Sequence, residues 1–401
     1  MIPTRFMVIA GEASGDELAA ELVRELRAGI ERRVHASNDL QPCNSSLAPR
    51  FFGAGGPRMA EAGVELAFDL TQHSVIGLDL LQKYFQFRKL FHRLFALALE
   101  REPHAIICVD FSVFNSMFAA AIKKHVRARR GTFNNWEPRV IKYISPQVWA
   151  SREGRAYQIA RDFDLLLSIF PFEKKWYACR VPSLHVEFVG HPLLDRYAFA
   201  QKNDSNLSPQ NPSIVLLPGS RQRELERHLP IMLEAFTKIR AAIPFASATV
   251  ILPSAELSGS ARHLISSTPS VQIQTGGLPE ALRTATIAIS KTGTITMECA
   301  CFGLPTVTLY KTSWATYEIG KRIVKVKSLT MPNLLAGEPI FPEFIQNDAT
   351  PEKISTAALE LLRNESARQR VRARLAEIMT SLGGPGASRR AADAILNLLP
   401  R

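Results

Sequence analysis

The chain of 401 residues is too long for one hydrophobic core of ordinary size, so its length predicts two or three domains. Hydrophobic residues make up 46% and charged residues 21%, values that are typical of a folded globular protein and argue against disorder. The formal net charge of +12 favours anionic partners, among which are nucleic acid, anionic lipid and phosphorylated substrates.

Three further observations narrow the class of protein. The basic residues are scattered except for one dense run at 123–130, and no nucleic-acid-binding module accompanies it, so we expect no nucleic-acid partner. The 5 cysteines have neither zinc-ligand nor redox spacing, which favours a reducing cytoplasm and predicts no metal site and no cofactor. No run approaches the roughly 18 apolar residues of a membrane span, so we expect none.

The first half of the chain shows alternating strands and helices. The apolar run at 6–10 predicts a strand, and a helix is expected from about Glu17, with Ser14 as its N-cap. Further strands are expected at 105–109, 140–144 and 165–169. Continuous apolar strands that alternate with helices are typical of a parallel sheet covered on both faces.

A second series of strands follows Gly190-His191-Pro192. Its strands are expected at 213–217, 248–252, 287–290 and 306–309, and its clearest helix at 224–239. The sequence therefore predicts an α/β protein with two doubly wound, Rossmann-like domains and a ligand in the interdomain cleft, at the carboxyl ends of the strands. We predict domain bounds of 1–192 and 193–375, with a helix at 376–401 that packs on the first domain or on a partner subunit.

Two strand-to-helix turns in the second half have the composition of a nucleotide site. At Pro218-Gly219-Ser220-Arg221, backbone N–H groups at a helix start lie beside Ser220 and Arg221, which suits a diphosphate. Near the second turn, Gly293 allows close approach, Thr294 can bind phosphate and Glu298 can bind ribose hydroxyls. Each turn alone is equally consistent with an ordinary capped helix, but together they favour a nucleotide-diphosphate site. No P-loop or NAD fingerprint is present.

Asp110 follows the buried strand 105–109 and is the candidate general base. A carboxylate at the carboxyl end of a buried strand faces the ligand edge of a parallel sheet, where a base is needed. The alternative is that Asp110 caps the next helix.

The segment 80–99 predicts an amphipathic helix. One face carries Leu80, Tyr84, Phe87, Phe91, Leu94 and Phe95, and the opposite face carries Gln82, Gln86, Lys89 and Arg93. Such a helix usually faces a protein core. Its large aromatic residues and its basic face are also typical of a helix at a membrane surface, so a lipid or acyl contact remains open.

Nine segments of the sequence resemble, in order and over nearly the whole chain, those of the lipid-A-disaccharide synthase family. The matching stretches are 11–16 (GEASGD), 56–59 (GPRM), 74–77 (SVIG), 145–150 (SPQVWA), 170–174 (FPFEK), 188–191 (FVGH), 217–221 (LPGSR), 293–298 (GTITME) and 332–337 (PNLLAG). Any one of them could be chance, whereas nine in sequence are specific.

The resemblance implies an inverting glycosyltransferase of the GT-B fold, cytoplasmic and peripherally bound to the inner membrane. It implies transfer of 2,3-diacylglucosamine from its UDP adduct to the 6-hydroxyl of 2,3-diacylglucosamine 1-phosphate, in lipid A biosynthesis and without a metal. Asp110 matches the family's candidate base, and Arg221 and Asn333 match positions attributed to UDP binding. By the same analogy Glu12, Ser14, Asp16 and His191 lie at the cleft.

The chain departs from the family pattern at two positions, since Val113 replaces a frequent second acid and Ser151 a frequent second tryptophan. Two rival functions remain open on sequence alone. One is a UDP-GlcNAc 2-epimerase, which shares the GT-B architecture and needs no lipid surface, and the other is a non-catalytic lipid- or nucleotide-binding protein. A homodimer, acyl chain preference and the roles of the insertions at 35–49 and 127–138 are not determined by the sequence.

Overall fold

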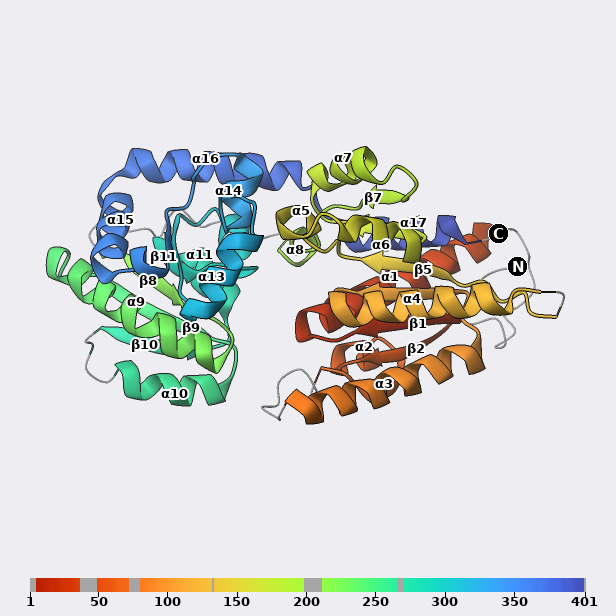
Figure 1. Cartoon of the computed structure of the whole chain (residues 1–401). Helices are drawn as coiled ribbons and strands as arrows, with labels where there is room; N and C mark the ends of the chain where they lie inside the picture. The colour runs from red at the N-terminus through yellow and green to blue at the C-terminus, as the bar shows by residue number, and fades with distance from the viewer. Residues whose placement is uncertain are drawn as a thin grey trace. The chain divides into compact units, whose positions relative to one another are not determined.

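A computed structural model describes residues 5–36, 49–71, 80–131, 133–197, 211–265, 268 and 270–399. It divides the chain into two compact units (Figure 1). Unit 1 comprises residues 1–195 and 382–401, and unit 2 comprises residues 196–381. The 74–77 stretch and residues 198–210 lie outside the described residues, as do the side chains of Leu80, Gln82 and Tyr84.

The described part of unit 1 contains a seven-stranded parallel sheet of order β3-β2-β1-β4-β5-β6-β7. The strands are β1 (Arg5–Ala10), β2 (Arg50–Gly55), β3 (Glu65–Asp69), β4 (Ala105–Val109), β5 (Arg139–Tyr143), β6 (Leu165–Ser168) and β7 (Val186–Phe188). Because β1 pairs with both β2 and β4, the carboxyl ends of these three central strands lie side by side.

Helices cover both faces of this sheet. One face is covered by α1 (Ala13–Ala36), α2 (Pro57–Glu61) and α17 (Ala387–Leu398). The other face is covered by α3 (Leu80–Arg101), α4 (Ser112–Arg129), α6 (Arg155–Asp162) and α7 (Pro171–Arg180), with the short α5 (Val148–Ser151) following β5. Alternate residues of β1 enter the two cores, Phe6 and Val8 on one face and Met7 and Ile9 on the other, which is why the strand reads as continuously apolar.

The last helix, α17, belongs to unit 1 although the whole of unit 2 precedes it in the chain. It packs along α1 and buries Ala391 and Ile395 in the unit 1 core. Its start is fixed by Asp195 in α8 (Leu193–Arg196), whose carboxylate accepts hydrogen bonds from the backbone N–H groups of Gly386, Ala387 and Ser388. A carboxylate at a helix N-terminus satisfies otherwise unpaired donors and complements the helix dipole.

The described part of unit 2 contains a six-stranded parallel sheet of order β10-β9-β8-β11-β12-β13. Its strands are β8 (Ser213–Leu217), β9 (Ser247–Leu252), β10 (Val271–Thr275), β11 (Ile287–Lys291), β12 (Thr306–Tyr310) and β13 (Glu343–Ile345). One face is covered by α9 (Gln222–Ala242), α10 (Ala255–Ile265) and α15 (Pro351–Arg363), and the other by α11 (Leu278–Thr284) and α12 (Ile295–Cys301). The remaining helices are α13 (Trp314–Ile323), α14 (Met331–Ala336) and α16 (Glu365–Ser381).

Candidate active site

The end of β4 places Asp110 on a left-handed backbone. Asp110 has a φ of 45° and Phe111 a φ of 40°, a conformation that non-glycine residues adopt at a cost of about 1–3 kcal/mol each. The Asp110 N–H donates to the Tyr143 carbonyl of β5 at 3.0 Å, and the Asn115 side chain donates to the Asp110 carbonyl at 2.9 Å. The sheet and α4 therefore hold the backbone of Asp110 in a strained corner, which is typical of a functional residue.

The loop after β1 accommodates this corner. A side chain at Gly11 would bring its Cβ to 2.4 Å from the ring of Phe111, so only glycine permits the ring to pack there. Glu12 and Ser14 are exposed beside it. The helix begins at Ala13, four residues earlier than expected, so Ser14 lies in the first turn of α1 and is not its N-cap.

Asp16 has a structural role that was not apparent from the sequence. The residue is 2% exposed, and its carboxylate accepts hydrogen bonds from the backbone N–H groups of Gly56, Arg58 and Met59 at 2.8–3.1 Å. These are the donors at the start of α2. Asp16 thus joins the GEASGD and GPRM segments of the sequence, and its oxygens are occupied by backbone.

A buried polar network lies at the carboxyl ends of β5 and β6. Glu173 is fully buried and accepts a hydrogen bond from the Trp149 indole at 3.0 Å and one from the Phe170 backbone at 3.3 Å. The Ser145 hydroxyl donates to the Tyr177 hydroxyl at 3.2 Å. Burial raises the pKa of Glu173 to about 7 despite these hydrogen bonds. The SPQVWA and FPFEK segments therefore form one structural unit around a carboxyl group.

This network predicts a stability that depends on pH. The pKa of Glu173 is raised from 4.5 to about 7, so the folded state retains a proton that the unfolded chain releases. The protonated Glu173 carboxyl stabilises the folded state in full below about pH 4.5. This stabilisation is lost as the pH rises to about 7, and the free energy of unfolding falls by at most about 3 kcal/mol. In urea unfolding between pH 5 and pH 8, Glu173→Gln should lack this decline, whereas Glu153→Gln, at an exposed ion pair, should keep it. If the free energy of unfolding has the same slope against pH in the wild type and in both variants, Glu173 is not the group responsible.

His191 lies where β7 leads into α8 and is 7% exposed. Its Nδ1 accepts a hydrogen bond from the Leu193 N–H at 3.2 Å, and its ring lies against Phe170 at 5.4 Å between centroids. Its backbone N–H donates to Leu382, at the start of the segment that returns to unit 1. The contacts of His191 are therefore those of a residue that orders this junction.

The aromatic face of α3 is not the free surface that a lipid contact along its whole length would need. Phe87, Phe91 and Phe95 are partly buried and pack against α4, with Phe87 and Phe91 at 4.9 and 5.6 Å from the Phe114 ring. With this face α3 covers the sheet, as a core-facing helix does, and the membrane or acyl contact of these three residues stays a prediction. On the other face Lys89 is exposed and the Arg93 guanidinium lies 5.6 Å from the Phe68 ring.

In unit 2, the predicted phosphate-binding turn lies at the end of β8. Gly219 has a φ of 128°, and a Cβ there would lie 2.4 Å from the Glu224 carboxylate. That carboxylate accepts a hydrogen bond from the Ser220 N–H at 3.0 Å. The expectation that backbone N–H groups of this turn are free for a diphosphate therefore does not hold for Ser220. Glu224 also contacts Lys291 at 3.1 Å and Arg221 at 3.4 Å.

Lys291 is a cation of this turn that the sequence pattern did not reveal. It is the last residue of β11, which pairs with β8, and its amine lies 17% exposed beside Glu224. Although burial opposes ionisation, Lys291 holds the pKa of Glu224 below its usual value. The turn therefore contains two cations, Arg221 and Lys291, around one carboxylate.

The second predicted turn adjoins the first, because it follows β11. Gly293 and Thr294 are exposed at its tip. Glu298, one turn into α12, accepts a hydrogen bond from the Tyr197 hydroxyl at 2.8 Å, and burial together with this carboxylate raises the pKa of Tyr197. The structure thus brings Ser220, Arg221, Gly293 and Thr294 to the carboxyl edge of two paired strands.

Two buried side chains fix the loops around this edge. His228 in α9 lies 2.8 Å from the Pro218 carbonyl through Nδ1, and its Nε2 accepts from the Lys311 N–H at 3.2 Å. Burial lowers its pKa, which favours the neutral ring that this pattern requires. Asn333 is 2% exposed, and its amide bonds the Phe341 backbone at both ends and the Glu343 carboxylate. The amide of Asn333 is therefore engaged within unit 2.

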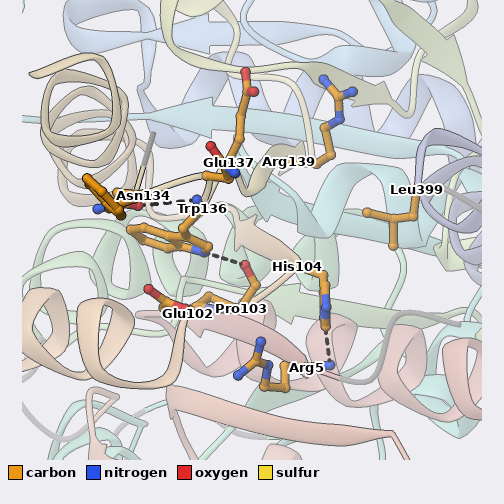
Figure 2. A pocket seen from close by; sticks show the side chains of 11 residues that line it. Arg5, Glu102, Pro103, His104, Asn134, Trp136, Glu137, Arg139 and Leu399 are labelled. Atoms are coloured by element: carbon orange, nitrogen blue, oxygen red, sulfur yellow. Dashed lines mark hydrogen bonds between the residues drawn. The ribbon is translucent and has the colours of Figure 1, made fainter. Parts of the chain in front are cut away.

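Two hollows occur in the described part of unit 1. The smaller, of about 270 Å³, has a lining that begins at Ser112, two residues after Asp110, and includes residues of α4 and α6, among them Val113, Met117, Pro146, Val148 and Arg155. The larger, of about 660 Å³, is shown in Figure 2, where the Trp136 indole donates to the Pro103 carbonyl and His104 accepts from the Arg5 backbone. The larger one lies at the amino ends of β1, β4 and β5, the opposite edge from Asp110.

Helix α13 in unit 2 exposes apolar residues that the sequence pattern did not single out. It contains no buried residue, and Trp314 and Ile319 are 75% and 60% exposed beside Lys321 and Arg322. Within the described ranges, no helix is both long and apolar enough to cross a bilayer. Over the same residues, no three His, Cys, Asp or Glu side chains form a group that could hold a metal ion.

Several solved structures share this fold of two parallel-sheet units. The chain resembles a UDP-GlcNAc 2-epimerase from Neisseria meningitidis solved with UDP-GlcNAc, with a TM-score of 0.62, 12% identity and coverage of 98% and 99% of the two chains. It also resembles a spinosyn rhamnosyltransferase solved with thymidine diphosphate, with a TM-score of 0.54, 13% identity and coverage of 97% and 100%. At these identities the likeness shows the fold, and it confirms the GT-B architecture.

Sequence comparisons are more specific. Residues 6–397 match the family model described as lipid-A-disaccharide synthetase. The lipid-A-disaccharide synthase of Anaeromyxobacter sp. (strain K) is 34% identical over 402 residues, which cover 98% of this chain and 97% of that protein. The lipid-A-disaccharide synthase of Geobacter metallireducens is 35% identical over 405 residues, with the same coverage. The chain is therefore a glycosyltransferase, and it belongs to the lipid-A-disaccharide synthase family.

Proposed function

We propose that the chain transfers 2,3-diacylglucosamine from its UDP adduct to the 6-hydroxyl of 2,3-diacylglucosamine 1-phosphate. The 6-hydroxyl oxygen attacks the anomeric carbon, the bond from that carbon to the diphosphate breaks, and the hydroxyl proton passes to a base. A single displacement inverts the anomeric centre and gives a β(1→6) bond and UDP. The observation that carries the proposal is the strained Asp110 corner at the ligand edge of the unit 1 sheet.

Asp110 is proposed as the base because the residue is partly exposed and its backbone is held by the Tyr143 carbonyl of β5 and by the Asn115 side chain. In unit 2, Arg221 and Lys291 are proposed to bind the diphosphate, with Thr294 beside them. Their charge would stabilise the UDP that leaves, which is the step at which negative charge develops. Glu298 is proposed to bind the ribose hydroxyls.

One assay tests this function. Purified protein is given both acylated substrates in detergent micelles with a chelator, and UDP and disaccharide are followed by chromatography and mass spectrometry. We expect both products in equal amounts with the chelator present. Disaccharide that appears only without the chelator would contradict the metal-independent mechanism. A parallel reaction supplied with UDP-GlcNAc alone tests the rival: its 2-epimer, with no disaccharide from the acylated substrates, would favour the epimerase. UDP binding without turnover in either reaction would favour a binding protein.

The 270 Å³ hollow beside Asp110 is proposed to hold an acyl chain of the acceptor. Val113 and Met117 lie one turn apart on α4 and are 61% and 52% exposed, and Pro146 and Val148 line the same hollow. Apolar side chains exposed next to a general base suit a substrate whose reacting sugar carries acyl chains. Arg155, at the start of α6, supplies a cation at the same hollow.

A charge introduced into this hollow should raise KM for an acceptor with acyl chains and leave KM for an acceptor without them unchanged. Met117→Glu is expected to raise KM for the diacylated acceptor by about 10–100-fold, because about 1.5–3 kcal/mol of apolar burial is lost. For an acceptor that lacks acyl chains the variant should match the wild type. Tyr157→Glu introduces the same charge at an exposed position of α6 outside the hollow and serves as the control. An equal rise in KM for both acceptors would contradict the acyl site.

The protein is proposed to work at the cytoplasmic surface of the inner membrane, and α13 supports this. Exposed Trp314 and Ile319 beside basic residues are typical of helices that lie on anionic bilayers. The double change Lys321→Glu and Arg322→Glu is expected to weaken binding to anionic vesicles at least about tenfold, since each basic residue near the surface contributes about 1 kcal/mol. The same change at Lys174 and Lys175, which are exposed on α7, controls for net charge. If both pairs weaken binding equally, α13 is not the contact.

A further inference from the structure

Tyr197 is held at both ends of its side chain, close to the point where the chain enters unit 2. Unit 2 begins at Arg196, so Tyr197 is its second residue. Its hydroxyl donates a hydrogen bond to Oε2 of Glu298 at 2.8 Å, and its ring lies against the Phe302 ring with 4.9 Å between the centroids. Because 101 positions separate Tyr197 from Glu298 in sequence, the fold of unit 2 brings the two together.

Both partners of Tyr197 lie on one face of α12. Glu298 is in this helix and Phe302 is its C-cap, and residues four apart in a helix are neighbours on its surface. Phe302 is 1% exposed and belongs to a buried cluster of unit 2 against which Tyr197 packs. The ring is therefore anchored on the core, and its hydroxyl fixes the carboxylate one turn earlier in α12.

This contact suits a carboxylate that also binds the donors of a ligand. Burial and the Glu298 carboxylate raise the pKa of Tyr197, so its hydroxyl keeps its proton and donates. A carboxylate has about four acceptor positions on its two oxygens, so a bond from one hydroxyl is compatible with bonds from the hydroxyls of a ribose. A glutamate side chain rotates about several bonds, and a rigid phenol that holds one of its oxygens lowers the entropy lost when a ligand binds.

We propose that Tyr197 is a positioning residue, which orients the Glu298 carboxylate for the ribose hydroxyls and thereby makes the site prefer nucleoside diphosphates with an intact ribose. The inference rests on the proposed role of Glu298 in ribose binding. The alternative is that Tyr197 only anchors the start of unit 2 on α12. An anchor of that kind affects stability and the affinity of every nucleotide alike, whereas a positioning residue affects those nucleotides that carry the ribose hydroxyls.

The test compares UDP with 2′,3′-dideoxy-UDP, which lacks both ribose hydroxyls, by calorimetric titration. The wild type should prefer UDP by about 10–100-fold, the usual contribution of a hydrogen bond to a charged group. Tyr197→Phe removes the hydroxyl and keeps the ring on Phe302. It should weaken the binding of UDP by about three- to tenfold, the usual cost of ordering one long side chain on binding, and leave the Kd for the dideoxy analogue unchanged.

Glu298→Ala and the double variant show whether the effect passes through the carboxylate. Glu298→Ala should abolish the preference for UDP, and adding Tyr197→Phe should weaken UDP binding no further. Tyr317→Phe, at a tyrosine of α13 in the same unit, is the matched control and should change neither Kd. An unchanged preference in Tyr197→Phe, or equal weakening of both ligands, would overturn the inference. A wild type without the preference, or Glu298→Ala that retains it, would instead refute the proposed role of Glu298, and the inference with it.

Discussion

Asp110→Asn should lower kcat by about 10²- to 10⁴-fold, the usual contribution of a general base, and leave the Kd for UDP unchanged. Asparagine keeps the size of the side chain and tolerates the left-handed backbone better than most residues, so the corner at the end of β4 should persist. It cannot accept the proton of the attacking hydroxyl. The measurement is steady-state turnover with saturating substrates, together with UDP binding by calorimetry.

Asp164→Asn is a suitable comparison for this variant. Asp164 belongs to the same unit and pairs with Lys123, so its loss should affect stability with little effect on kcat. Wild-type turnover in Asp110→Asn would move the base to another carboxylate. Parallel losses of turnover and UDP binding would point to a damaged fold.

Lys291→Met should weaken UDP binding by about 10–100-fold, because a hydrogen bond to a charged group contributes about 1.5–3 kcal/mol. The amine lies at the carboxyl end of β11, beside the turn after β8 that carries Ser220 and Arg221. Lys238→Met removes a surface lysine of the same unit that pairs with Glu352, and it should leave the Kd unchanged. Calorimetric titration with UDP measures both.

A rival explanation is that Lys291 acts only by holding Glu224. Glu224→Gln and the double variant separate the two cases. If Lys291 contacts the diphosphate, its loss should weaken UDP binding as strongly in the Glu224→Gln background as in the wild type. If it only orients the carboxylate, Glu224→Gln alone should reproduce the loss, and the double variant should show no more.

Strands with uniform apolar character were predictable, and strands of mixed composition were not. The expected strands at 105–109 and 213–217 agree with β4 and β8 in both bounds. The strand β2 was missed because its sequence RFFGAG contains two glycines, and β10 because its alternate residues are polar and exposed at the sheet edge. Parallel pairing of distant segments supplies the stability that such sequences lack locally.

The positions of candidate site residues were predictable where a strand end and a special side chain coincide, as at Asp110 and Arg221, whose roles stay predictions. Those that act through a partner from another segment were not. Asp16 and Glu173 bind backbone and indole groups that are far away in the sequence, and Lys291 reads as one more basic residue until β11 is paired with β8. The aromatic residues of α3 were recognised from their helical spacing, but the partner of that face could not be predicted. The same spacing is expected for a helix that packs on a protein core and for one that lies on lipid.

The return of α17 to unit 1 has a consequence for how the chain is made. Unit 2 is continuous in sequence, so a ribosome delivers all of it before residues 382–399. Until then the face of α1 that receives Ala391 and Ile395 has no cover, and Asp195 has no helix start to bind. Unit 1 begins to be synthesised first and is completed last. A nascent chain stalled before residue 382 would leave this apolar face of α1 exposed, and chaperones that recognise apolar surface would be needed there.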